Sequence, residues 1–328
     1  MTSARADFAR ADFPGRLELV ARAESVINAG SKSFRFASRL FDRRTRERSW
    51  LLYAWCRACD DLADGQTLGH DARAPANPAV GLAIIRRQTQ RALAGEATGE
   101  VPFDALGLVV RECSIPERFI HDHVEGFALD AAGWRPQSEA DLLRYCYHVA
   151  GAVGCMMAVL MGVAPDDEAT LDRAADLGIA FQLANIARDL TDDAEVGRIY
   201  VPQAWLAEAG LSGAVLADQG NREALASIAA RLCALERCYR DSARAGASRL
   251  PFRSRWAVLA AARIYGAIAD KVAALGSKAW DERVTTSKAE KLRHVLAAWR
   301  EARFGAPVQV DRTDLWQRPP SARRQSAS

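Results

Sequence analysis

Residues 181–193 read FQLANIARDLTDD, and this stretch decides how the chain folds. Asn185, Asp189 and Asp193 recur every four residues, and half of the positions between them are apolar. A spacing of four predicts an α-helix with three oxygen-bearing side chains on one face. Further back, the same face carries one amide and two small residues: Gln182, Gly178 and Ala175. Small residues leading into polar oxygens, on a helix that is otherwise apolar, are typical of a cavity wall.

The rest of the chain also has the pattern of helices. Proline is absent from four long stretches, residues 15–74, 166–201, 203–250 and 252–306, and each can hold long helices. Apolar residues recur at intervals of three and four, and no run alternates between apolar and polar as a strand would. The sequence therefore predicts an all-α protein.

The 328 residues are 49% hydrophobic and 26% charged, which allows a large core and excludes a disordered or coiled-coil chain. No stretch reads as a domain linker. We expect a flexible N-terminal segment over residues 1–16 and one all-α domain over residues 17–306. A loosely ordered basic tail should follow over residues 307–328, because arginines stand there among Pro, Ser and Gln.

Charge and cysteine content limit partners and location. A net charge of +3 gives no long-range field for a polyanion, so nucleic acid is not an expected partner. The first 30 residues lack the apolar core of a secretory signal. The 7 cysteines are odd in number and stand in apolar or helical runs, unlike a disulfide framework. We expect a cytoplasmic protein with reduced thiols.

A second acidic stretch, residues 52–64, reads LYAWCRACDDLAD. On a helix, spacings of four, three and four place Tyr53, Arg57, Asp60 and Asp64 in one stripe. Two carboxylates about 6 Å apart repel by roughly 3 kcal/mol at an effective dielectric of 20. A partly buried pair therefore calls for a cation, and Arg57 or a metal ion could supply it.

Acids at this spacing are most often the solvated faces of surface helices, but two such clusters in one chain favour a site. Oxygen ligands without His or Cys in register select Mg²⁺ over zinc, with Mn²⁺ as the alternative ion. Mg²⁺ held by one or two carboxylates completes its shell with water and substrate phosphates. The sequence therefore predicts a phosphate or diphosphate ligand beside an apolar cavity.

Residues 145–165 contain no charged side chain and are long enough to span a bilayer. A central buried helix needs the same apolarity and is the preferred interpretation, because His148 and three glycines interrupt the run. Gly154 in this run fits either close helix packing or room for a long apolar chain. For the second role, we expect Gly154→Leu to impair acceptance of a long chain and leave the fold intact.

Several motifs, in this order, resemble the squalene and phytoene synthases, the head-to-head prenyl synthases. They are GSKSF at 30–34, LYAWCR at 52–57 with DDLAD at 60–64, EGFALD at 125–130, YCYHVAGAVG at 145–154, residues 182–193, and GRIYVP at 197–202. Together the resemblance runs from about residue 25 to 300. It implies an all-α isoprenoid synthase fold with the active site in a central cavity.

The resemblance also implies roles for individual residues. The metal ligands would be Asp60, Asp64, Asn185, Asp189 and Asp193. The substrate site would be lined by Ser31, Ser33, Phe34, Tyr53, Arg57, Tyr145, Gln182 and Arg188. Tyr265 and Arg283 resemble late diphosphate contacts of the family. Asp192 stands beside Asp193, and helical spacing and the family pattern both favour Asp193.

The implied reaction is a Mg²⁺-dependent condensation of two molecules of geranylgeranyl diphosphate, through prephytoene diphosphate, to phytoene. No nicotinamide is expected. The alternatives are a squalene or dehydrosqualene synthase acting on C15 substrates, and a non-catalytic assembly factor, which should have lost acidic ligands. Because substrate and product are oily, we also expect transient contact with a membrane surface, aided by the basic tail.

Overall fold

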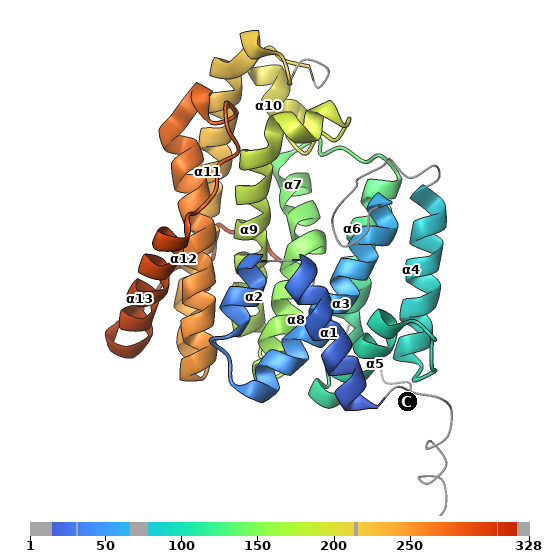
Figure 1. The fold of residues 1–328 in the computed structure, drawn as a ribbon. Coiled ribbons are helices and arrows are strands. Elements are labelled where there is room, and N and C mark those ends of the chain that lie inside the picture. The colour runs from blue at the N-terminus through green and yellow to red at the C-terminus, as the bar shows by residue number, and fades with distance from the viewer. Residues whose placement is uncertain (1–14, 31, 66–77, 213–215, 307, 320–328) are drawn as a thin grey trace, which may run out of the picture. The chain divides into compact units, whose positions relative to one another are not determined.

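The computed structural model describes residues 15–30, 32–65, 78–212, 216–306 and 308–319, and the side chains of residues 32–34 lie outside that description. No described residue lies in a β-strand, which confirms the all-α prediction (Figure 1). Contacts divide the chain into two compact units, Met1–Glu117 and Arg118–Ser328. The expectation of a single domain over residues 17–306 stays a prediction.

The first unit is built around α3, which packs against α1, α4 and α5. Its apolar face buries Leu51, Leu52 and Trp55. The helix begins after Asp42, whose carboxylate accepts the backbone N–H of Thr45 as an N-cap. The described helices of this unit are α1 (Arg16–Gly30), α2 (Lys32–Ser38), α3 (Arg43–Asp64), α4 (Pro78–Leu93) and α5 (Val101–Cys113).

The second unit is built around α9, the longest helix described in it, which packs against α8, α11 and α12. Its α-helices are α6 (Glu117–Ala131), α7 (Glu139–Cys146), α8 (Ala152–Leu160), α9 (Glu168–Glu195), α10 (Gln203–Glu208), α11 (Arg222–Gly246), α12 (Phe252–Leu275) and α13 (Lys288–Phe304). A π-helical turn, η1 (Tyr147–Gly151), joins α7 to α8, and 3₁₀ turns η3 (Gln219–Asn221), η4 (Ala247–Arg249) and η5 (Gly276–Lys278) flank α11 and α12.

The apolar run predicted from the sequence becomes α7, η1 and α8. Glu139–Leu160 is one helical run long and apolar enough to cross a bilayer, and 61% of its most apolar window is buried inside the structure. Burial of that extent is what a core helix shows. Close approach to α9 explains two glycines: a Cβ on Gly154 would lie 2.2 Å from the carbonyl oxygen of Ala174, and a Cβ on Gly178 would lie 2.2 Å from that of Ala150.

The structure differs from the expectation of a loosely ordered tail over residues 308–319. Arg312 donates two hydrogen bonds of 2.8 Å to the carboxylate of Asp176, which is fully buried on α9. Arg318 lies 2.6 Å from Asp172 on the same helix. The backbone N–H of Trp316 donates to the hydroxyl of Tyr239 on α11. These arginines serve as counter-ions of two acids on α9, one of them fully buried, so this segment is anchored on the second unit.

Candidate active site

The last turns of α9 carry the acids singled out in the sequence. Leu183, Ala184, Ile186, Ala187 and Leu190 are buried, so one broad side of the helix faces the core. The candidate ligands lie on the half-buried side between core and solvent: Asn185, Asp189 and Asp193. The predicted helical face is thus confirmed, whereas the ligand role of these residues stays a prediction.

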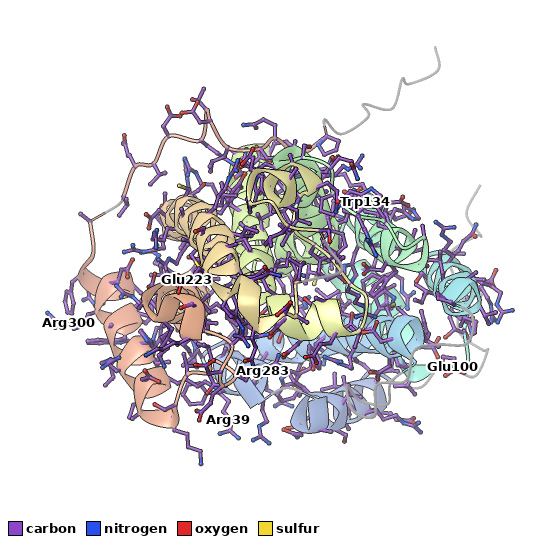
Figure 2. All side chains as sticks on the ribbon, turned by 90° about the horizontal axis from the view of Figure 1, so that it is seen from above. Arg39, Glu100, Trp134, Glu223, Arg283 and Arg300 are labelled. Atoms are coloured by element: carbon purple, nitrogen blue, oxygen red, sulfur yellow. The ribbon has the colours of Figure 1, made fainter. Side chains whose placement is uncertain are left out.

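Asp189 is held by two arginines. The guanidinium of Arg188 donates to Asp189 Oδ1 at 2.8 Å, and both side chains are 16% exposed. Arg283, which follows α12 and is labelled in Figure 2, lies 3.0 Å from Asp189 and 3.4 Å from Asp192. The structure therefore brings together three of the predicted site residues, two cationic and one anionic.

Asp193 is less well compensated than Asp189. Burial and the neighbouring Asp189 carboxylate raise the pKa of Asp193 to about 7, although Arg198 acts to lower it. Burial is the larger of the two effects that raise it. A carboxyl group buried beside another carboxylate is stabilised in its charged form by a nearby cation.

The donor set on α9 fits a magnesium ion that is shared with a substrate. No three His, Cys, Asp or Glu side chains gather into a closed metal cluster within the described ranges. Mg²⁺ does not need such a cage, because one or two carboxylates with substrate phosphate and water complete its shell. Two carboxylates and an amide at helical spacing meet that requirement.

Three aromatic rings form a stack in the second unit. The ring of Tyr145 lies 4.8 Å from that of Tyr200 and 5.8 Å from that of Trp134. Both tyrosine hydroxyls donate to the carboxylate of Asp130, at 3.0 and 3.3 Å. Burial raises the pKa of both hydroxyls above the usual value, so both stay protonated at neutral pH.

Two more predicted residues lie along α9 and α12. The ring of Tyr265 stacks on Phe181 at 4.2 Å, and its electrostatic interaction with Arg188 is one of the effects that raise the pKa of Arg188 against burial. Gln182 is half-buried on the same stretch of α9 as Asn185. The structure therefore places Tyr265 beside the arginine that holds Asp189.

The first unit holds the second acidic stretch. Arg57 lies 3.9 Å from Asp60 and 3.7 Å from Asp61, and the attraction of Asp60 contributes to raising the pKa of Arg57 against the opposing effect of burial. A Cβ on Gly30 would lie 2.8 Å from the hydroxyl of Tyr53. The end of α1 thus meets the predicted stripe of α3, and Asp64 is the last residue of that helix.

Three predicted substrate contacts lie at or next to the start of α2. Ser31 lies outside the described residues, and Ser33 and Phe34 belong to α2 but their side chains are not described. The acids of α3 and of α9 belong to different units. The prediction that they face one another across a cavity stays a prediction.

One expectation is wrong and one contact was missed. Gly154→Leu cannot leave the fold intact, because its Cβ would meet the backbone of α9 at 2.2 Å. Asp130, which accepts hydrogen bonds from Tyr145 and Tyr200, was not singled out as a site residue. Its only sequence signal is its place at the end of the EGFALD motif, because its partners lie 15 and 70 residues away.

Known proteins resemble this chain over most of its length. The sequence profile of squalene/phytoene synthases matches residues 27–290. A 15-cis-phytoene synthase from Pantoea ananas is 46% identical over 308 residues, which cover 92% of this chain and 98% of the relative. A 15-cis-phytoene synthase from Enterobacter agglomerans is 47% identical over 300 residues, or 89% of this chain and 100% of the relative.

Solved structures agree with this assignment. A dehydrosqualene synthase crystallised with a ligand is 26% identical, with a TM-score of 0.77 over 86% of this chain and 96% of that one. These findings confirm the predictions of a prenyltransferase and of an isoprenoid synthase fold. The chain belongs to the squalene/phytoene synthase family.

Proposed function

We propose that this protein joins two molecules of geranylgeranyl diphosphate head to head and releases phytoene. The relatives that are 46% and 47% identical are both named 15-cis-phytoene synthase, which supports this product. The observation that carries the chemistry is the pair Asp189 and Asp193 on α9. One acid is held by two arginines, and the other has a raised pKa because it is buried beside the Asp189 carboxylate.

The reaction has two ionisations. In the first, the C1–O bond of one substrate breaks, diphosphate leaves, and C1 bonds to the double bond of the second substrate. Loss of a proton then closes the cyclopropane ring of prephytoene diphosphate. In the second, the remaining diphosphate leaves, the carbon skeleton rearranges, and loss of a proton gives phytoene. No reductant is consumed, so no nicotinamide is needed.

The proposed metal ligands are Asp60, Asp64, Asn185, Asp189 and Asp193. Mg²⁺, or Mn²⁺ in its place, would neutralise the diphosphate and make it a better leaving group. The side chains around α9 would orient that group. Arg188 and Arg283 already lie against Asp189 and can donate to phosphate oxygens, because guanidinium groups match their geometry.

The other proposed contacts come from both units. Tyr265 would contact the diphosphate beside Arg188, and Gln182 would line the route from it. In the first unit, Arg57 would hold diphosphate through its guanidinium, next to Tyr53. The remaining proposed contacts are Ser31, which follows α1 in the sequence, and Ser33 and Phe34 of α2.

Tyr145 would act on the carbocation. Its ring belongs to the stack with Trp134 and Tyr200, and π-faces attract cations. Asp130 fixes the orientation of both hydroxyls. Because both hydroxyls stay protonated, neither phenol competes with the substrate double bond as a nucleophile.

We place the reaction in the cytoplasm, with transient contact at a membrane surface that takes up the hydrocarbon. The test is to incubate the purified protein with geranylgeranyl diphosphate and Mg²⁺ in detergent, extract the hydrocarbon and determine its mass. We expect phytoene, lost with EDTA and unaffected by omitting NADPH. A C30 product from farnesyl diphosphate with no C40 product would instead show a squalene-type enzyme, and absence of diphosphate release would show a binding module.

A further inference from the structure

The outward side of α13 exposes large apolar side chains in one stripe. Leu292 and Leu296 are 55% and 57% exposed, Trp299 is 39% exposed and Phe304, at the helix end, is 70% exposed. Spacings of four and three place the first three on one side of the helix. An adjacent side of the helix, which carries Val295, Ala298 and Ala302, is buried, and α13 packs against α12. Single exposed apolar residues are ordinary, but a stripe along one helix marks an interaction surface.

The charges on that outward side have one sign. The two acids of α13 point the other way into ion pairs: Glu290 lies 2.7 Å from Lys271, and Glu301 is paired with Arg244 and Arg263. The charged residues that remain exposed on α13 are all basic: Lys288, Arg293, Arg300 and Arg303. Figure 2 labels Arg300 on the outer side of this helix. We call the stripe and these basic residues the outer face of α13.

We propose that the outer face of α13 docks on the surface of an anionic lipid bilayer. Apolar side chains on one face of a helix enter the boundary between headgroups and acyl chains, and Arg and Lys beside them bind anionic headgroups. The helix has 17 residues, or roughly 25 Å at 1.5 Å per residue, so it can lie along a membrane surface. This proposal locates the membrane contact of the proposed function but does not depend on the reaction.

Charge favours a lipid surface over a second copy of the chain. A symmetric dimer through this face would bring the same patch of both copies together. The arginines of one copy would then meet those of the other, with no exposed acid on α13 to compensate them. An anionic bilayer has negatively charged headgroups for the basic residues of this face and an apolar layer beneath them for its apolar side chains.

The test is flotation of the full-length protein with vesicles of phosphatidylcholine alone or with added phosphatidylglycerol. We expect binding to the anionic vesicles, weakened by salt. Leu292→Ser with Leu296→Ser should lower the affinity at least about tenfold. Arg293→Gln with Arg300→Gln should lower it about 30-fold, because each basic residue near the surface contributes about fivefold.

Matched controls use exposed residues of the same types elsewhere on the chain. Leu17→Ser removes an exposed leucine of α1, and Arg87→Gln with Arg237→Gln removes the same charge from α4 and α11. The controls should bind vesicles as the unaltered protein does. All variants should form phytoene in detergent as before, which shows that they are folded.

Three results would overturn the proposal. They are failure to float with anionic vesicles, equal flotation of the outer-face variants and the unaltered protein, and a dimer in light scattering that the leucine variant abolishes. The last would show a protein interface instead. Vesicle binding without any phytoene would refute the reaction alone, and phytoene formation without vesicle binding would refute the docking alone.

Discussion

Helix α9 carries the same acidic spacing near both of its ends, with opposite outcomes. Asp172 and Asp176 lie four residues apart near its beginning, and Asp189 and Asp193 lie four apart near its end. Each pair has arginines near it. The pairs differ in how completely those arginines compensate the acids, and this separates a structural pair from a candidate binding site.

The first pair is fully compensated. Asp176 is completely buried, and Arg312 meets its carboxylate with two hydrogen bonds of 2.8 Å, while Ser242 also donates to it. Burial raises the pKa of Asp176, and the bond to Arg312 opposes that effect. Arg318 covers Asp172 at 2.6 Å and is itself only 6% exposed. Both carboxylates of this pair have arginine counter-ions within the protein, so neither needs an added cation.

The second pair is compensated unevenly. Asp189 is held by Arg188 and Arg283, whereas burial and Asp189 together raise the pKa of Asp193 to about 7, although Arg198 acts to lower it. Arg283 is 57% exposed, so its place beside Asp189 is open to solvent. The comparison teaches that acidic spacing alone does not make a site. A better criterion for a binding site is a pair of acids that arginines neutralise incompletely and that solvent and substrate can reach.

The largest expected effect is on stability, at the first pair. Arg312→Gln leaves the buried carboxylate of Asp176 without its cation, which should lower the free energy of unfolding by about 3–5 kcal/mol. Urea unfolding measures it. Arg231→Gln, which breaks half-exposed pairs with Glu139 and Glu208, is the control and should cost about 1 kcal/mol or less.

A second variant keeps that prediction open to refutation. Adding Asp176→Asn to Arg312→Gln removes the buried charge and should restore part of the lost stability, because a neutral amide is less costly to bury than a carboxylate. If Arg312→Gln lowers the free energy of unfolding no more than Arg231→Gln does, the residues after α13 contribute no stabilising buried ion pair.

The next effect is on activity, at the second pair. Asp189→Asn should lower the rate of phytoene formation more than about 100-fold, as loss of a metal ligand does in other enzymes. Asp192→Asn removes the same charge from the neighbouring position, where the side chain is 59% exposed, and should change the rate little. Steady-state kinetics with geranylgeranyl diphosphate and Mg²⁺ compares them. Equal losses would mean that net charge matters and position does not.

The third effect is a pH dependence of stability in EDTA. The folded protein holds the proton of Asp193 up to about pH 7, whereas the unfolded chain loses it near pH 3.8, as an ordinary aspartate does. Folding therefore takes up a proton in this window, and this group's contribution to stability falls as pH rises from about 4 to 7.

Asp193→Asn should remove that fall. Each tenfold change in proton affinity corresponds to about 1.4 kcal/mol, so we expect the variant to gain at least about 1 kcal/mol over the unaltered protein at pH 8. The difference should shrink at pH 5. Thermal unfolding at both pH values measures it, with Asp192→Asn as control. A gain that is the same at both pH values would show that Asp193 does not titrate in this window.

The sequence predicts the helices and the acidic faces well, because both depend on residues three or four apart. It does not distinguish the two acidic pairs of α9 by spacing, since D-x-x-x-D reads alike at 172–176 and 189–193. The family motif selects the second pair, and the structure gives the physical reason. Arg312 lies 136 residues from Asp176, a distance over which no local pattern reports a contact.

The same limit explains two other differences. The arginines after residue 307 read as a loosely ordered tail, because their acidic partners are remote in sequence. Gly154 reads equally as a channel residue and as a packing residue, and only the approach of the α9 backbone decides between them. Such contacts are tertiary, so they follow from the packing of helices and not from the helices themselves.

The smallest expected effect is on stability at Arg283, and it distinguishes this arginine of the second pair from Arg312 of the first. Arg283 is more than half exposed, and Asp189 keeps its contact with Arg188 when Arg283 is lost. Arg283→Gln should therefore change the free energy of unfolding by less than about 1 kcal/mol, the usual range for an exposed pair. If the exposed guanidinium also contacts diphosphate, the KM for geranylgeranyl diphosphate should rise about fivefold with kcat little changed.

Arg312→Gln should show the reverse, a loss of stability with an unchanged KM in the folded fraction, because its guanidinium has its buried partner already. A loss of stability in Arg283→Gln as large as in Arg312→Gln would mean that both ends of α9 are held by structural ion pairs, and the distinction between them would fail.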